Sequence, residues 1–147
     1  KVGENIAVRR IDVFTNAGTV GTYIHMNRIG VLVELERGSS ELARDLAMQV
    51  AATSPRYVSI DEVPAADLAK EREIFSALAA QEGKPPEIVA KMVEGKLRKH
   101  FDEVTLVGQP FVKDPDKRVR ELLKANGAAV KRFLRYEVGE GIDKASP

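Results

Sequence analysis

The sequence contains no cysteine and no tryptophan, and only two of its 147 residues are histidines. Without cysteine the chain has no disulfide scaffold, thiolate nucleophile, zinc finger or iron–sulfur cluster. The two histidines, His25 and His100, are far apart in sequence and do not suggest a histidine-built metal site. No apolar run approaches the roughly 18 residues that span a bilayer, so we expect no membrane partner. The lack of cysteine also fits a reducing compartment, and we expect a cytoplasmic protein.

An excess of charge of one sign is absent too. Lysine and arginine number 23 and aspartate and glutamate 22, which gives a net charge of +1. This balance excludes a strong overall field toward nucleic acid or an anionic membrane. Basic residues gather near the chain ends, at Arg9, Arg10, Lys131, Arg132 and Arg135. Nucleic-acid readers usually add exposed aromatic side chains to such bases. Few aromatics lie nearby, so we do not expect a nucleic-acid partner.

The usual sequence signatures of enzymes are missing as well. The chain has no phosphate loop of the form GxxxxGK[ST], no HExxH and no GxSxG motif. Its carboxylates lie among lysines and arginines at helical spacing, which is typical of a solvated helix face. We therefore expect no catalytic residue and no enzyme activity. The apolar content of 44% still predicts a folded domain with a core of its own.

The first third of the chain has the alternation of β-strands. We predict strands over residues 6–13, with a bulge near Arg9 and Arg10, over residues 20–25 and over residues 29–35. A tight turn at residues 26–28 joins the second strand to the third. Connections this short indicate an antiparallel meander.

Helical periodicity begins after this meander. A helix over residues 41–52, capped by Ser39 or Ser40, is followed by helices over residues 65–82 and 87–100. Their apolar stripes contain, in turn, Leu42, Leu46 and Val50; Leu68, Ile74, Phe75, Leu78 and Ala79; and Ile88, Val89, Met92, Val93, Leu97 and Phe101. A short segment with glycine and two prolines joins the last two helices, so they should pack antiparallel as a hairpin.

The last third is predicted as strand, loop, helix and strand. We place a short strand at residues 104–107, an irregular loop at 108–112, a helix that opens at Asp114-Pro115 and a strand at 130–138. The fold class is therefore α+β. It consists of a small antiparallel sheet covered by helices, with an antiparallel helical hairpin.

We expect two structural units. Residues 1–60 and 103–147 form the α+β core, and residues 61–102 form the hairpin inserted in it. One β-branched, basic, basic, apolar pattern occurs twice, at residues 8–11 and 130–133. It is either a coincidence or a trace of duplication. In the second case the segment 1–14 is the last strand of a preceding half.

Seven short segments run through the chain in an order that carries a resemblance. They are Lys1-Val2-Gly3-Glu4-Asn5-Ile6 with Arg9-Arg10; Tyr23-Ile24-His25 with Arg28-Ile29-Gly30-Val31-Leu32-Val33; Ala47-Met48-Gln49-Val50-Ala51-Ala52; Glu82-Gly83-Lys84-Pro85; Lys91-Met92-Val93-Glu94-Gly95-Lys96; Gly108-Gln109-Pro110-Phe111-Val112; and Arg135-Tyr136-Glu137-Val138-Gly139-Glu140-Gly141. Together they resemble the bacterial elongation factor Ts family. The resemblance covers essentially the whole chain but only the C-terminal part of the family protein.

The resemblance implies a partner and a mode of action. Family members bind the GTPase elongation factor Tu, disturb its magnesium and phosphate site and let GDP leave, with no catalytic residue or cofactor of their own. The implied partner-binding residues are Val2 and Gly3 toward the nucleotide-binding domain, and His25 with Met26 and Val112 with Lys113 toward the third domain of Tu. The implied fold has two similar α+β halves, each with a small antiparallel sheet, and the helical hairpin is expected to project from the second half as a coiled coil.

Two parts of the family pattern are missing. One is an N-terminal helical module, and the other is a Thr-Asp-Phe-Val segment whose Asp and Phe wedge into Tu beside its magnesium site. The corresponding loop, residues 36–40, contains no Asp-Phe pair. The first residue is Lys1 rather than Met, so we expect a fragment or a processed product. We expect docking to outlast exchange activity. A self-associating module, as a homodimer, is the alternative hypothesis, and an RNA-associated module comes third.

Overall fold

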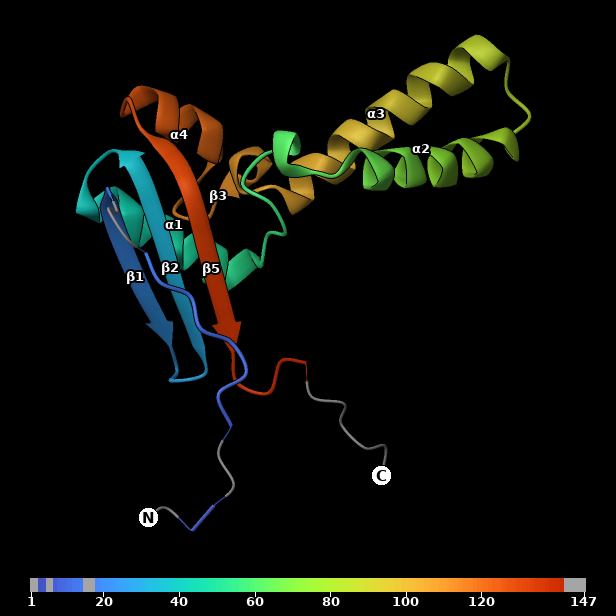
Figure 1. Cartoon of the computed structure of the whole chain (residues 1–147). Helices are drawn as coiled ribbons and strands as arrows, with labels where there is room; N and C mark the ends of the chain where they lie inside the picture. Colours follow the sequence, from blue (N-terminus) through green and yellow to red (C-terminus); the bar gives the residue numbers. More distant parts are fainter. Residues whose placement is uncertain (1–2, 5–6, 15–17, 142–147) are drawn as a thin grey trace.

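The computed structural model describes residues 3–4, 7–14 and 18–141 (Figure 1). Its centre is a three-stranded antiparallel sheet with the strand order β1-β2-β5. The strands are β1 (Thr19–His25), β2 (Ile29–Arg37) and β5 (Ala129–Glu137). These three predicted strands are therefore confirmed, with their ends shifted by no more than two residues.

The turn at residues 26–28 joins β1 to β2. Met26 and Asn27 both have positive φ angles, 49° and 55°. The Arg28 N–H donates to the His25 carbonyl at 2.9 Å. Two successive left-handed residues match the twist of the flanking strands. The turn therefore fixes the register in which His25 lies opposite Ile29.

Helix α1 (Ser40–Thr53) covers one face of the sheet, as predicted. Ser39 is its N-cap, and the Ser39 hydroxyl accepts a hydrogen bond from the Leu42 N–H at 3.1 Å. The predicted stripe is buried against alternate residues of β2 in one core. This core includes Leu42, Leu46, Val50, Val31, Val33 and Leu35. The amphipathic spacing of the helix thus explains why it packs on the sheet.

Helices α2 (Ala65–Ala80) and α3 (Pro86–Val104) form a helical hairpin that extends away from the sheet (Figure 1). They enclose a second core, whose buried residues are Val63, Ala79, Val93, Leu97 and Phe101. Three residues predicted for the seam instead face outward, since Ile74 is 43%, Leu78 50% and Ile88 47% exposed. Only one face of each helix can meet the other helix. The supercoiling of a coiled coil stays a prediction.

The segments that flank the hairpin contain short elements. A 3-10 turn, η1 (Ile60–Glu62), precedes α2. In place of the strand predicted at residues 104–107, α3 continues to Val104 and Thr105 makes a single bridge to Tyr57. A second 3-10 turn, η2 (Leu106–Gly108), follows. The prediction of a strand here was wrong because the apolar run at this point is the end of a helix and a buried turn.

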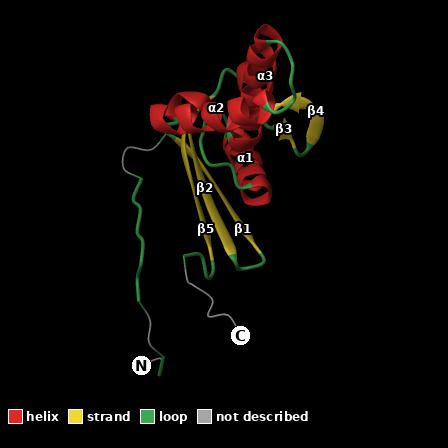
Figure 2. Ribbon diagram, turned by 90° about the vertical axis from the view of Figure 1, so that its right-hand side faces the viewer, coloured by secondary structure: helices red, strands yellow, loops and turns green. Residues whose placement is uncertain are grey.

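The Asp114-Pro115 pair does not open a helix. It begins β4 (Asp114–Arg118), which pairs antiparallel with β3 (Pro110–Phe111), and α4 (Val119–Ala125) starts only after it. Pro115 is tolerated because β4 belongs to a two-stranded sheet in which every strand is an edge. Figure 2 shows α1 between the three-stranded sheet and the β3–β4 pair.

Residues 7–14, which we call the strap, do not form the predicted strand. The backbone of the strap joins neither sheet, and the strap runs beside β5 (Figure 1). Contacts come from side chains, as where Arg10 Nη2 donates to the Arg135 carbonyl at 3.1 Å. A strand requires a paired backbone, which these contacts do not provide. Ile6, the first residue of the predicted strand, lies outside the described residues.

The α+β class is confirmed by these elements. The division into a core of residues 1–60 and 103–147 and an inserted hairpin of residues 61–102 stays a prediction. In the ranges that the structure describes, no helix combines the length and the apolar character needed to cross a membrane.

Candidate partner-binding surface

The tip of the β1–β2 hairpin carries two of the predicted contact residues, His25 and Met26. His25 is exposed, and its Nδ1 lies 3.3 Å from the Tyr23 hydroxyl oxygen. The two rings stack with their centroids 6.1 Å apart. Met26 is 79% exposed. An imidazole supported by a second ring, next to an exposed thioether, gives a tip that can contact another protein through both polar and apolar groups.

The turn between β3 and β4 carries two more, Val112 and Lys113. Val112 is 43% exposed, whereas the preceding residue, Phe111, is buried in the first core. Phe111 therefore anchors the turn while Val112 faces outward. The Lys113 Nζ lies 3.0 Å from Asp45 Oδ1 of α1. The β3–β4 turn thus presents an apolar side chain next to a cation that α1 holds.

A cavity of about 500 Å³ lies beside the β3–β4 turn. Its apolar lining consists of Pro110, Phe111, Val112 and Pro115. Glu103 also lines it, together with Thr53 at the end of α1. A lining of this kind suits an aliphatic or aromatic side chain better than a charged ligand.

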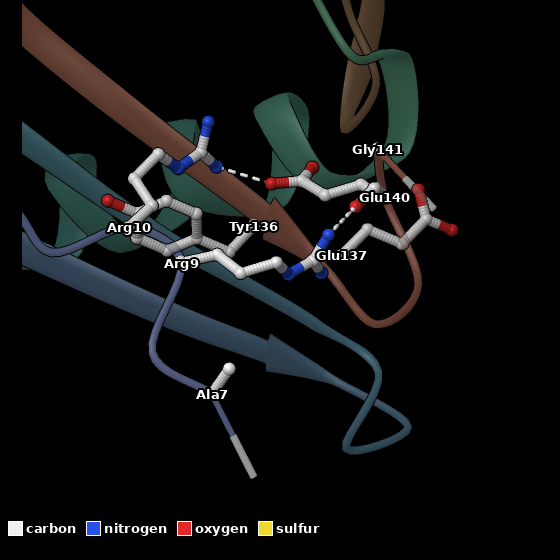
Figure 3. Close-up of a pocket in the computed structure, with 7 residues that line it drawn as sticks. All are labelled: Ala7, Arg9, Arg10, Tyr136, Glu137, Glu140 and Gly141. Carbon is white, nitrogen blue, oxygen red and sulfur yellow. Dashed lines mark hydrogen bonds and ion pairs between the residues drawn. The ribbon is translucent and has the colours of Figure 1, made fainter. Parts of the chain in front are cut away.

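A larger cavity, of about 640 Å³, lies between the strap and the end of β5 (Figure 3). Its arginines are already engaged, because Arg9 Nη1 donates to the Glu140 carbonyl at 2.7 Å and Arg10 pairs with the Glu140 carboxylate. The Arg10 guanidinium carbon also lies 3.9 Å from the centre of the Tyr136 ring. The two arginines therefore clamp the strap to the end of β5 and the turn that follows it.

Tyr136 makes a further contact with the strap. Its hydroxyl donates a hydrogen bond to the Asp12 carboxylate. This bond, together with desolvation, raises the pKa of Tyr136 above the ordinary value, because both favour the neutral phenol. The nearby Arg10 cation acts in the opposite direction without reversing the shift. The arrangement stabilises the strap and does not prepare a base.

The basic residues that suggested RNA binding are paired with carboxylates. Lys131 and Arg132 lie 3.6 Å and 2.8 Å from the carboxylate of Glu34, and Arg135 lies 3.2 Å from Glu137. The hydrogen bond from Arg132 lowers the pKa of Glu34, although burial of the carboxylate opposes this. The two pairs with Glu34 join β2 to β5, whereas Arg135 and Glu137 pair within β5; all three use cations that an RNA backbone would need. The structure therefore does not favour the RNA hypothesis.

The structure divides the predicted contact residues into separate groups. His25 with Met26 lies at the hairpin tip, and Val112 with Lys113 lies beside α1. Among the described residues, no hydrogen bond or ion pair joins these two groups. Gly3 is exposed and has a φ of 70°, and Val2 lies outside the described residues.

Sequence reasoning missed the residues that support these groups. Tyr23 stacks on His25, Asp45 pairs with Lys113, and Gln49 accepts a hydrogen bond from the Val112 N–H at 2.8 Å. A polar residue within a helix normally indicates a solvated position, so the sequence held no signal for the contacts of Asp45 and Gln49. In the described part of the chain, no group of three or more His, Cys, Asp or Glu side chains could hold a metal ion.

Comparison with known proteins gives one consistent family. The family model described as "Elongation factor TS" matches residues 1–140. Curated relatives named elongation factor Ts include those of Thioalkalivibrio sulfidiphilus, 59% identical over 146 residues, Halorhodospira halophila, 57% over 144, and Legionella pneumophila, 54% over 144. Each alignment covers 98% of this chain but only 49–50% of the relative. The chain therefore spans about half the length of the curated relatives it matches.

Proposed function

This chain belongs to the elongation factor Ts family, and we propose that it is part of a translation elongation factor that binds elongation factor Tu and promotes the release of GDP from it. The observation that carries the proposal is the family match, which extends over residues 1–140. The family name supports Tu as the partner and the cytoplasm as the place of action. The proposed role is nucleotide exchange, which requires no catalytic residue from this chain.

The contacts we propose come from both exposed groups. His25, Met26, Val112 and Lys113 would meet the third domain of Tu, while Val2 and Gly3 would meet its nucleotide-binding domain. The exposure of Met26 and Val112 supports this assignment, since each has apolar area that a partner can remove from water. Complete burial of such a side chain contributes about 1.5–3 kcal/mol. Two such anchors, with polar neighbours, suit a reversible protein–protein contact.

Acceleration of GDP release is a separate requirement. An exchange factor must bind the nucleotide-free GTPase more tightly than the GDP-bound form, because a ligand with equal affinity for both states shifts nothing. The residues described here provide affinity. The Asp-Phe wedge that would create the preference is missing from loop 36–40. We therefore propose that docking by this chain outlasts its exchange activity.

The experiment is a titration of Tu loaded with fluorescent GDP, in which binding and GDP release are followed together. We expect saturable binding with little acceleration of release. The full-length relative from Thioalkalivibrio sulfidiphilus is the positive control for release. Strong acceleration by this chain would mean that the missing wedge is dispensable. Absence of binding would contradict the proposed function itself.

Self-association is the second candidate, and the strap favours it. Val8, Ile11 and Val13 are 78%, 76% and 69% exposed on a segment whose backbone pairs with neither sheet. Exposed apolar side chains on an unpaired extended segment can recruit another strand. The same observation supports the proposal that the segment 1–14 is the last strand of a preceding half. Sedimentation equilibrium decides between them: a mass that rises with concentration supports the homodimer, and a constant monomer mass contradicts it.

A further inference from the structure

Gln49 is the one fully buried side chain of α1 that carries polar atoms among the described residues, with 0% exposure. It lies beside Val50 in a helix face that otherwise buries alanine, leucine and valine. A buried amide is costly unless its donors and acceptor are all used. The question is therefore which groups satisfy this side chain.

All the partners of the Gln49 amide belong to the segment that leads into the β3–β4 turn. Its Nε2 donates to the Pro110 carbonyl at 3.0 Å and to Gln109 Oε1 at 3.2 Å. Its Oε1 accepts the Val112 N–H at 2.8 Å. The Gln49 side chain thus binds three groups of this segment: the Gln109 side chain, the Pro110 carbonyl and the Val112 N–H.

Gln109 connects this network to the C-terminal ends of two helices, α1 and α3. Its Oε1 lies 2.8 Å from the Thr53 hydroxyl at the end of α1, and its Nε2 donates to the Glu103 carbonyl at 2.9 Å. Like Gln49, Gln109 is buried, at 4% exposure. A fully satisfied buried network of this kind specifies a single arrangement.

We propose that Gln49 is the positioning residue of the β3–β4 turn, and that it fixes the Val112 backbone so that Val112 and Lys113 face the partner. The proposal rests on the proposed function in its second part, the contact with Tu. Asp45, one helical turn before Gln49, holds Lys113 through an ion pair at 3.0 Å. The Lys113 side chain of that pair is 50% exposed, and ion pairs open to solvent fix geometry weakly. The buried amide is therefore the main constraint on the turn.

The test uses Gln49→Met, which keeps the length of the side chain and removes every hydrogen bond of the amide. We expect the Val112 N–H to exchange with solvent at least tenfold faster than in the unchanged chain, measured by NMR. We expect the affinity for Tu to fall by up to about fivefold, because a displaced turn loses the apolar contact of Val112, and the loss of two methyl groups has about this size. Val93→Ala, in the separate hairpin core, is the matched control for a loss of stability that does not touch the turn.

A double-mutant cycle with Val112→Ala distinguishes positioning from a general structural effect. If Gln49 acts through Val112, the Gln49→Met change should have little further effect on Tu affinity when Val112 is already alanine. Additive losses would overturn the proposal. Rapid exchange of the Val112 N–H in the unchanged chain would overturn it as well, without any variant. If neither chain binds Tu, the proposed function fails, while the exchange measurement still decides whether Gln49 positions the turn.

Discussion

Glu34 on β2 and Arg132 on β5 face each other across the sheet, with Arg132 Nε 2.8 Å from a carboxylate that is only 1% exposed. Lys131 Nζ lies 3.6 Å from the same carboxylate, and the Gly18 N–H donates to it at 3.4 Å. A buried carboxylate in a small sheet needs such partners, because an unpaired one would be strongly destabilising. The pair therefore links the strands that the sequence separates by almost a hundred residues.

The first prediction concerns acid stability. Arg132 lowers the folded-state pKa of Glu34 below its ordinary value of 4.5. The contribution of this pair to the free energy of unfolding is fully present above the pKa of Glu34 in the unfolded chain. It is lost as the pH falls through the lower pKa of Glu34 in the folded chain. Glu34→Gln should therefore be destabilising at pH 7, and its difference from the unchanged chain should shrink below about pH 4. Urea unfolding at a series of pH values measures this, and parallel profiles for the two chains would contradict it.

The second prediction compares two glycines of neighbouring strands. A Cβ on Gly21 of β1 would overlap the backbone carbonyl of Ala43 in α1, whereas a Cβ on Gly30 of β2 would meet nothing within 4 Å. Gly21→Ala must push α1 away from the sheet and should cost about 1–3 kcal/mol of unfolding free energy. Gly30→Ala should be neutral or slightly stabilising, since glycine weakens a strand. Equal effects of the two substitutions in urea unfolding would refute this account of the helix–sheet contact.

Local patterns were sufficient to predict α1 but not the elements that depend on a distant partner. Ser39 and the stripe of Leu42, Leu46 and Val50 lie within one segment, so capping and amphipathic spacing were both visible in the sequence. The Asp114-Pro115 pair has the same local chemistry in a helix start and in a short edge strand. Its pairing with β3 decides between them, and that pairing is a tertiary contact.

In the candidate site, too, features within one segment could be predicted from the sequence, and contacts between distant segments could not. His25 and Val112 could be assigned from the family resemblance, and both prove to be exposed. Nothing in the sequence assigned a role to Gln49, because its partners lie about sixty residues further along the chain. The strap was predicted as a strand from its β-branched residues. Side-chain contacts with Tyr136 and β5 replace the backbone pairing that this prediction required.

The third prediction concerns the apolar contact with Tu. Val112→Ala removes two methyl groups from an exposed position of the β3–β4 turn and should weaken Tu binding by about 1 kcal/mol, or roughly fivefold. Ile74→Ala is the matched control, since Ile74 is an aliphatic residue of the same 43% exposure but lies on α2 of the helical hairpin, to which none of the predicted contact residues belongs. Calorimetric titration of Tu with each variant measures the difference. If both variants bind as the unchanged chain does, Val112 is not a contact residue.

The fourth prediction concerns the clamp between the strap and β5. The hydrogen bond to the Asp12 carboxylate raises the pKa of Tyr136 above its ordinary value of 10.0, so one of the three tyrosines should ionise at higher pH than a free phenol. Asp12→Asn should bring that ionisation back toward the ordinary range, because it removes the charge that opposes the phenolate. Ultraviolet difference titration records the change.

The same group has a consequence for stability at high pH. The folded-state pKa of Tyr136 is raised. Its contribution to the free energy of unfolding is therefore fully present below the ordinary pKa and is lost as the pH rises through the folded-state pKa. Tyr136→Phe identifies the component, because the high-pH ionisation should disappear together with the Tyr136 hydroxyl. If Asp12→Asn leaves the titration curve unchanged, Asp12 does not contact Tyr136 in solution. In that case the strap has one contact fewer with β5 and is freer to pair with another strand, as the proposal of a preceding half requires.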